Sequence, residues 1–200
     1  MSATLGFWYE FGSSYSYPAA SRIEDAAAAA GVAIEWRPFL LGPIFARQGW
    51  RDSPFNLYPD KGRYMWRDLE RLCADAGLPL RRPSAFPRNG LLAARIALIA
   101  ADEGWCPAFS RAVYHANFAE DRDIGAPTAI AAILESLGCP AGALLARAAT
   151  PEVKERLKTQ TADAMARGIF GAPSFTVGTE LFWGNDRLDQ ALEWARRAPG

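Results

Sequence analysis

The sequence predicts an α/β protein in which a βαβ unit and a ββα unit are separated by a large, all-helical insertion. An apolar strand, an alanine-rich helix and a second strand follow one another within residues 7–38. A β-hairpin pattern occupies residues 174–183, and helical patterns fill most of the chain between them. Because neither end unit buries its sheet alone, we expect the two ends of the chain to pair in one sheet.

The first unit is defined by an abrupt change of composition. β-formers dominate residues 7–11, which read Phe-Trp-Tyr-Glu-Phe. After a glycine, Ser13 and Ser14 are good N-cap residues for an alanine-rich helix over residues 17–30. Gly31 is typical of a helix C-terminus. The next apolar run should then pair with the first strand in parallel, as βαβ units do.

The middle of the chain predicts one irregular segment followed by helices. Residues 39–59 contain several glycine and proline breakers, and a loop of this length is often functional. Beyond it, apolar residues recur at helical spacing. The predicted helices cover residues 61–77, 90–104, 107–118, 127–137, 140–149 and 150–168. Thr150, followed by Pro151 at the first helical position, is the expected cap of the last one.

The last unit is a hairpin followed by a helix. Residues 174–177 form a strand, Gly-Thr a turn, and residues 180–183 its partner. Asn185 or Asp186 is the expected cap of the final helix. The whole order is that of a thioredoxin-like fold with a helical insertion. We expect residues 1–45 and 168–200 to form the thioredoxin-like domain and residues 46–167 the insertion.

Composition excludes several classes of function. Half of the 200 residues are apolar, while 22 basic and 22 acidic residues give no net charge. This argues against nucleic acid and anionic membranes as partners. No apolar run approaches the ~18 residues of a membrane helix, and the first residues lack a signal-peptide pattern. The cysteines Cys73, Cys106 and Cys139 form no zinc or disulfide signature. We therefore expect a cytoplasmic protein without a metal site.

The first candidate site is the Ser13-x-x-Ser16 motif. It stands where a redox protein of this fold would carry Cys-x-x-Cys. Serines cannot form a disulfide, but their hydroxyls can donate hydrogen bonds to a thiolate supplied by a ligand, and a helix N-terminus favours an anion. The simpler alternative is that Ser13 and Ser14 only cap the helix.

The second candidate site is Gly-Ile-Phe-Gly-Ala-Pro-Ser-Phe at residues 168–175. Ala172-Pro173, directly before a strand, is a candidate cis peptide in a tight turn. Proline there leaves neighbouring backbone groups outside the sheet ladder, where they can pair with a ligand backbone. An ordinary glycine-proline loop is the alternative.

These motifs resemble those of the 2-hydroxychromene-2-carboxylate isomerases. That family consists of glutathione-dependent relatives of kappa-class glutathione transferases, in the DsbA-like branch of thioredoxin folds. Phe-Trp-Gly-Asn-Asp-Arg-Leu at residues 182–188 belongs to the same resemblance. Further similar stretches at residues 59–69, 86–89 and 118–124 extend it over essentially the whole chain. The family usually has proline directly after the first serine, where this chain has Ser14.

The resemblance implies a role for each matching position. Ser13 matches the serine that contacts the glutathione sulfur. Ala172 and Pro173 match the backbone pair that holds the cysteinyl unit, and Asn185 and Asp186 match the polar pair that binds the γ-glutamyl end. In physical terms, Asp186 can form a salt bridge with the α-ammonium group.

Other residues are expected around the ligand. Lys61 is a candidate partner for the glycyl carboxylate or the substrate carboxylate; a solvated lysine is the alternative. Either Asp52 or Asn56 takes the loop position at which the family often has asparagine. The candidates for lining an aromatic substrate pocket are Tyr15, Trp50, Lys61, Trp66, Arg88 and Asn89, although aromatic residues at helical spacing are more often core.

The implied activity is the glutathione-dependent cis-trans isomerisation that interconverts 2-hydroxychromene-2-carboxylate and trans-o-hydroxybenzylidenepyruvate, or a close analogue, in aromatic catabolism. The partner would be a small aromatic carboxylate, and relatives suggest a homodimer. One alternative is a kappa-like transferase that conjugates glutathione to electrophiles. Another, from a different class, is a thioredoxin-fold binding module without turnover.

Overall fold

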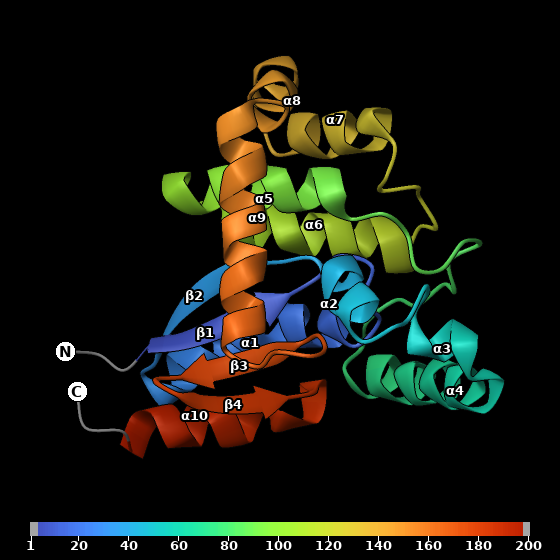
Figure 1. Cartoon of the computed structure of the whole chain (residues 1–200), viewed down its shortest axis with the longest axis vertical. Coiled ribbons are helices and arrows are strands. Elements are labelled where there is room, and N and C mark those ends of the chain that lie inside the picture. The colour runs from blue at the N-terminus through green and yellow to red at the C-terminus, as the bar shows by residue number, and fades with distance from the viewer. Residues whose placement is uncertain (1–3, 198–200) are drawn as a thin grey trace.

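A four-stranded sheet in the order β2-β1-β3-β4 joins the two ends of the chain (Figure 1). The strands are β1 (Thr4–Tyr9), β2 (Ala33–Pro38), β3 (Ser174–Val177) and β4 (Glu180–Trp183). β1 pairs with β2 in parallel, and with β3 antiparallel, while β3 and β4 form the hairpin. The predicted fold class is therefore confirmed. This computed structural model describes residues 4–197, so the outermost residues of the two segments predicted to form the thioredoxin-like domain lie outside the described part.

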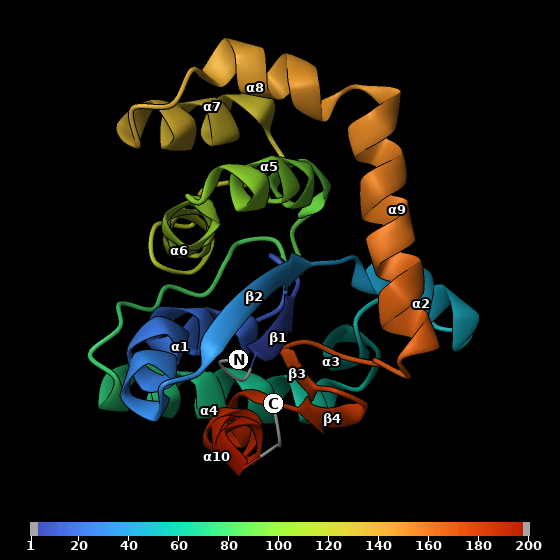
Figure 2. The same cartoon turned by 90° about the vertical axis from the view of Figure 1, so that its left-hand side faces the viewer.

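The helices surround the sheet and fill the chain between β2 and β3. They are α1 (Ser16–Ala30), α2 (Leu41–Arg47), α3 (Pro54–Leu57), α4 (Pro59–Asp75), α5 (Leu91–Glu103), α6 (Cys106–Phe118), α7 (Pro127–Ser136), α8 (Ala141–Ala148), α9 (Pro151–Ala166) and α10 (Leu188–Arg197). Figure 2 shows α7 and α8 above α5 and α6, with the sheet below them, α1 beside the strands, and α4 and α10 near the bottom of the view. α9 runs from α8 back to the level of β3, where the chain re-enters the sheet.

The two faces of β1 enter two hydrophobic cores, as alternation along a strand requires. Phe7 and Tyr9 join the main core, where the ring of Phe7 stacks on Phe175 of β3 at 5.6 Å. Trp8 points the other way, into a smaller cluster that includes Phe39 and Ala164 of α9. Burial on both faces fixes the register of β1, because a one-residue slip would exchange the faces.

The predicted cap of α1 is wrong, although its predicted start at residue 17 is only one residue late. The helix begins at Ser16, its N-cap is Tyr15, and no side chain caps it. The hydroxyls of Ser13 and Ser14 have found tertiary partners instead: Ser13 donates to the Ala172 carbonyl and Ser14 to the Met65 sulfur. Residues 10–15 therefore form a turn that precedes the helix. Its C-terminus is as predicted, since Gly31 adopts a left-handed conformation (φ 67°).

Two other local predictions need correction. Residues 39–59 are not wholly irregular, because α2 and α3 lie within them; proline at the first turn of a helix, as at Pro54, is compatible with helix formation. Asn185 and Asp186 do not cap α10. They form the 3₁₀ turn η1 (Asn185–Arg187), which leads directly into the helix. By contrast, the Thr150 hydroxyl caps α9 as expected.

The contact between α3 and α4 depends on Gly62. A Cβ at this position would overlap the backbone carbonyl of Phe55, so only glycine lets α3 pack against the first turn of α4. We expect Gly62→Ala to lower the free energy of unfolding by about 1–3 kcal/mol, since backbone carbonyls cannot rotate away as a flexible side chain can. Urea unfolding measures this change.

Gly42 in α2 is the matched control. It is also helical, but a Cβ there would meet no atom within 4 Å. Gly42→Ala should therefore leave stability unchanged or raise it by up to ~1 kcal/mol. Equal effects of the two substitutions would contradict the packing argument.

Candidate functional site

Two segments from opposite ends of the chain meet at Ser13. Its hydroxyl donates a 2.9 Å hydrogen bond to the carbonyl of Ala172, 159 residues away. Its backbone N–H bonds to the Glu10 carbonyl at 3.0 Å, which closes the turn after β1. The pairing of β1 with β3 is what brings these two turns together. Ser13 and Ala172, predicted independently from two motifs, are thus in direct contact.

The Ala172-Pro173 peptide bond is cis, as predicted. The Pro173 carbonyl accepts a 3.0 Å hydrogen bond from the N–H of Gly184, which connects this turn to the end of β4. The Ser174 hydroxyl donates to the Gly171 carbonyl at 2.9 Å. The segment before β3 is therefore held from both sides and presents Ala172 next to Ser13.

The turn after β4 carries the next predicted pair. Asn185 is buried, with 6% of its surface exposed, and its backbone carbonyl accepts a 2.7 Å hydrogen bond from Arg22 of α1. The side chain of Asp186 is 71% exposed and lies 3.3 Å from that of Arg187. One member of the pair is thus fixed to α1, and the other is free to meet a ligand.

One face of α4 lies against the turn that holds Ser13. The buried Ser14 hydroxyl contacts the Met65 sulfur at 2.7 Å, and the Tyr15 hydroxyl donates to Asp68 at 2.9 Å. Burial raises the pKa of Tyr15 well above its usual value, and the carboxylates of Asp68 and Asp186 raise the pKa further. Tyr15 is therefore a neutral donor between α4 and the Asp186 turn.

Lys61 lies on the exposed first turn of the same helix. Its ammonium group sits 5.0 Å from the centre of the Tyr58 ring, a cation–π contact. Within residues 4–197 no carboxylate forms an ion pair with it. Lys61 is therefore a surface cation that keeps its capacity to bind an anion.

The remaining predicted residues differ in how they are engaged. Trp50 packs on Phe45 with ring centres 5.5 Å apart. Asn89 accepts the N–H of Leu91 at 2.9 Å, at the start of α5. The amide of Asn56 donates both to Asp52 and to the Phe86 carbonyl, so neither Asp52 nor Asn56 is singled out as the loop residue facing a ligand.

Arg88 is buried in a network of its own. Its guanidinium donates to the carboxylate of Asp121 and the carbonyl of Arg122, and more weakly to Asn117. These partners tie the segment before α5 to the end of α6. The aromatic candidate Trp66 is 8% exposed and packs on Phe86 at 4.9 Å, so it contributes mainly to the core.

Glu10 is a titratable group to which the sequence analysis gave no role. Its carboxylate accepts the N–H of Gly12 at 3.0 Å and lies against Gly90, where a Cβ would come within 2.7 Å of one of its oxygens. Burial raises the pKa of Glu10 to about 7, although the Gly12 hydrogen bond lowers it. The sequence feature that could have pointed to Glu10 is a glutamate at the end of an otherwise apolar strand.

The two buried thiols, those of Cys73 and Cys106, are not poised for reaction. Burial raises the pKa of Cys73 to about 11 and also raises the pKa of Cys106. Low-pKa thiolates are the reactive form, so neither of these two buried thiols is activated as a nucleophile. Within residues 4–197, no group of three or more potential metal-binding side chains occurs.

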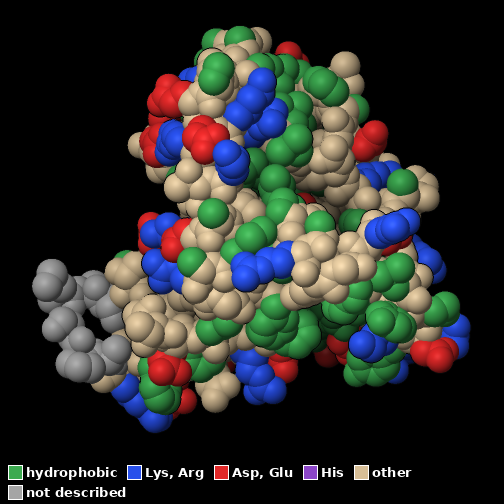
Figure 3. All heavy atoms as spheres, viewed as in Figure 1, with side chains coloured by type: hydrophobic (Ala, Val, Ile, Leu, Met, Phe, Trp, Pro, Cys, Tyr) green, Lys and Arg blue, Asp and Glu red, His purple; other side chains and the backbone are tan. Residues whose placement is uncertain are grey.

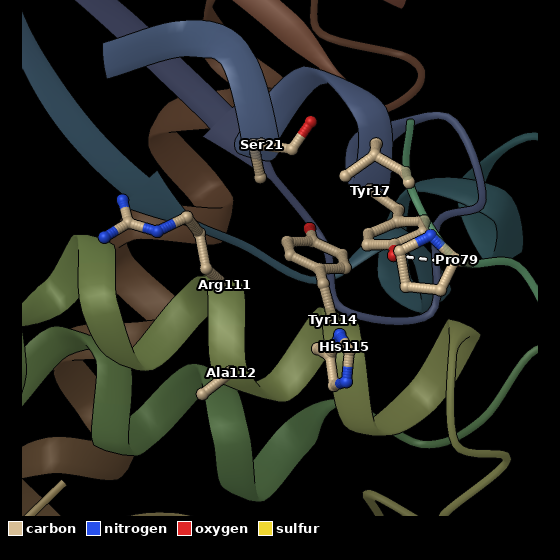
Figure 4. Close-up of a pocket in the computed structure, with 9 residues that line it drawn as sticks. Tyr17, Ser21, Pro79, Arg111, Ala112, Tyr114 and His115 are labelled. Carbon is tan, nitrogen blue, oxygen red and sulfur yellow. Dashed lines mark hydrogen bonds between the residues drawn. The ribbon is translucent and has the colours of Figure 1, made fainter. Parts of the chain in front are cut away.

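A separate pocket of about 320 Å³ lies between α1 and α6 (Figure 4). Its lining includes Tyr17, Pro79 and Arg111, and none of the predicted site residues. The hydroxyls of its two tyrosines are already engaged: Tyr17 donates to the Pro79 carbonyl, and Tyr114 to the Glu10 carbonyl. We therefore place the candidate site at the Ser13–Ala172 contact and not in this pocket.

Charges of both signs are interspersed on the face seen in Figure 3, with hydrophobic side chains between them. This agrees with the zero net charge of the chain. None of the helices in the described part of the chain is long and apolar enough to cross a membrane.

The fold and the site agree with what comparison with known proteins finds. The model of the DSBA-like thioredoxin domain matches residues 4–194. The chain belongs to this family. It differs from a disulfide oxidoreductase in having serine, not cysteine, at both ends of the Ser13-x-x-Ser16 motif.

Individual relatives are similar to this chain over most of its length. A 2-hydroxychromene-2-carboxylate isomerase of Sphingobium xenophagum is 32% identical over 190 residues, covering 94% of this chain and 96% of that protein. Human glutathione S-transferase kappa 1 is 32% identical over 171 residues, covering 78% and 74%. A solved 2-hydroxychromene-2-carboxylate isomerase structure superposes with a TM-score of 0.86 at 27% identity, covering 96% and 93% of the two chains. The resemblance seen in the motifs is confirmed.

The raised pKa of Glu10 predicts a pH dependence of stability. Folding favours the protonated form of Glu10. The stability that protonated Glu10 contributes is therefore complete below pH 4.5 and is lost as the pH rises through about 7. We expect the Glu10→Gln variant to gain stability relative to wild type over this window, by up to about 3 kcal/mol. Urea unfolding at pH 5 and pH 8 measures it; a difference that stays constant with pH would contradict the prediction.

Proposed function

We propose that this protein is a glutathione-dependent isomerase acting on 2-hydroxychromene-2-carboxylate and trans-o-hydroxybenzylidenepyruvate, or on a close aromatic analogue. The observation that carries the proposal is the contact between the Ser13 hydroxyl and the carbonyl before cis-Pro173. It places a hydroxyl donor next to a backbone acceptor, which are the two groups that a cysteinyl unit needs for its sulfur and its amide. The similarity to isomerases along the whole chain supports the same activity.

Ser13 has a donor that can change partner. Its O–H now bonds to the Ala172 carbonyl. If it turns to a ligand sulfur, it stabilises the thiolate, and the Ala172 carbonyl becomes free to accept the ligand's amide N–H. Because the Ser13 hydroxyl and the Ala172 carbonyl are adjacent, they can bind the sulfur and the amide N–H of the same cysteinyl unit. No thiol of the chain is required.

The charged ends of glutathione fit the residues around this contact. Asp186 has an exposed carboxylate for the α-ammonium group, and its exposed ion pair with Arg187 is weak enough to be shared. Lys61 has an ammonium group without a carboxylate partner among the described residues, suited to the glycyl or the substrate carboxylate. We therefore assign Ser13, Ala172, Pro173, Asn185, Asp186 and Lys61 to glutathione binding.

Glutathione, when bound, supplies a thiol nucleophile that adds reversibly to the conjugated double bond of the ring-opened substrate and so permits rotation. The chain contributes the environment. Ser13 holds the sulfur in its anionic form, and a pKa lower by one unit corresponds to about 1.4 kcal/mol of stabilisation. Tyr15, Trp50 and Asn89 remain proposed substrate contacts, while Arg88, with its nitrogens engaged internally, would act by holding the segment before α5.

The proposal includes a small aromatic carboxylate as substrate, a cytoplasmic location and a homodimer. Of these, the substrate class is supported by the similarity to a 2-hydroxychromene-2-carboxylate isomerase. The balanced composition gives no reason to add nucleic acid or membrane partners.

Replacing Ser13 tests the assignment directly. In calorimetric titrations with reduced glutathione, we expect wild type to bind saturably and Ser13→Ala to bind with the ligand thiol titrating about one pH unit higher, because the O–H donor is gone. Ultraviolet absorbance of the thiolate reports this pKa. Turnover of 2-hydroxychromene-2-carboxylate should fall in parallel.

Ser21→Ala is the matched control. Ser21 is a half-buried serine of α1 whose hydroxyl bonds, among the described residues, to the nearby Pro18 carbonyl alone. The thiol pKa in this variant should equal that of wild type. Absence of binding at millimolar glutathione would refute the cofactor assignment and favour a thioredoxin-fold binding module.

Product analysis separates the isomerase from a kappa-like transferase, to which the chain is also similar. An isomerase releases a rearranged product and leaves the glutathione concentration unchanged, because the thiol adds and then leaves. A transferase forms a stable thioether and consumes one glutathione per turnover. We expect the first result with hydroxychromene carboxylate; stoichiometric glutathione loss would contradict it.

A further inference from the structure

Arg22 of α1 is joined to the turn after β4 by several hydrogen bonds. One terminal nitrogen donates to the backbone carbonyl of Asn185 at 2.7 Å, and the Nε donates to the side-chain Oδ1 of Asn185 at 3.5 Å. The other terminal nitrogen bonds to both carboxylate oxygens of Asp189, at 3.0 and 3.1 Å. One guanidinium thus contacts the turn and the first residues of α10.

These contacts fix which way the Asn185 amide points. A guanidinium has donors and no acceptor, so the atom facing Arg22 has to be the amide oxygen. The Nδ2 group then lies on the opposite side. It makes no hydrogen bond within residues 4–197, and it is not among the buried polar atoms that lack a partner, so it stays in contact with solvent. A mostly buried side chain therefore presents an unused N–H donor.

The neighbouring residue presents the opposite kind of group. Asp186 has an exposed carboxylate, which only accepts hydrogen bonds. The turn therefore offers one fixed donor and one anionic acceptor on consecutive residues. This combination is complementary to a zwitterion, whose carboxylate needs a donor and whose ammonium needs an acceptor.

We propose that Arg22 is a positioning residue that orients the Asn185 amide so that the turn recognises a free α-amino acid group. Nδ2 of Asn185 binds the α-carboxylate, and Asp186 binds the α-ammonium. This inference rests on the proposed function, because the α-amino acid group is then the γ-glutamyl end of glutathione. It extends that function, because the turn then binds the α-carboxylate of this end as well as its α-ammonium group.

A purely structural role for Arg22 makes a different prediction. Asp189 is 75% exposed, and ion pairs of this kind contribute little to stability. If Arg22 only fastens α1 to α10, its replacement weakens all ligands equally or none. If it orients the amide, the loss is confined to ligands that carry an α-carboxylate.

The test compares glutathione with γ-aminobutyryl-cysteinylglycine, which lacks only the α-carboxylate, by calorimetric titration. We expect Asn185→Asp to weaken glutathione binding at least ~10-fold, as loss of a hydrogen bond to a charged group does, and to change binding of the analogue less than about 2-fold. Arg22→Met should reduce the preference for glutathione over the analogue at least ~5-fold, because the amide is free to turn. Arg22→Lys should retain part of that preference.

Two control variants distinguish orientation of the Asn185 amide from a purely structural link between α1 and α10. Asp189→Asn removes the ion pair but leaves the bonds from Arg22 to Asn185, and Arg111→Met removes another ion pair of α1, with Glu24. Both should keep the wild-type preference. An unchanged preference in Arg22→Met and Asn185→Asp, with wild type binding glutathione, overturns this inference alone. No binding of glutathione to wild type overturns the proposed function together with it.

Discussion

The antiparallel pairing of β1 with β3 is the constraint on which the rest of the structure depends. Trp8 lies opposite Ser174, so the turn that follows β1 and the turn that precedes β3 emerge at the same edge of the sheet. The Ser13–Ala172 hydrogen bond is a direct result. Stacking of Phe7 on Phe175 beneath the pair, and burial of Trp8 on the other face, hold this register.

The helical insertion is positioned by the same sheet and contributes to the site from one side. α4 supplies Met65 and Asp68 to the turn around Ser13, and α6 supplies the Tyr114 hydroxyl to the Glu10 carbonyl beneath it. The turn is thus supported by hydrogen bonds from helices that lie far away in the sequence. Such support suits a site whose donors need fixed directions, because each supporting bond removes an alternative conformation.

Much of the fold followed from local patterns, and the errors have a common cause. The hairpin, the Thr150 cap and the Gly31 terminus depend on neighbouring residues only, and they were predicted correctly. The N-cap of α1 was not, because the hydroxyls of Ser13 and Ser14 bond to Ala172 and Met65 and not to their own helix. A cap is a local competition that a distant partner can win, and the sequence does not show that partner.

The features of the candidate site also fall into two groups, those visible in the local sequence and those that depend on tertiary contacts. The motifs around Ser13, Ala172 and Asn185 were visible as residue types at recognisable spacings, and so was the cis peptide before Pro173. The raised pKa of the half-buried Glu10 carboxyl and the guanidinium that orients Asn185 were not visible, since each depends on what packs against it. The sequence by itself determined the class of fold and the chemistry of the groups, through periodicity and side-chain type. Only the tertiary structure decided which groups meet, which way their donors point and where a proton is held, because those properties arise from contacts between residues far apart in the chain.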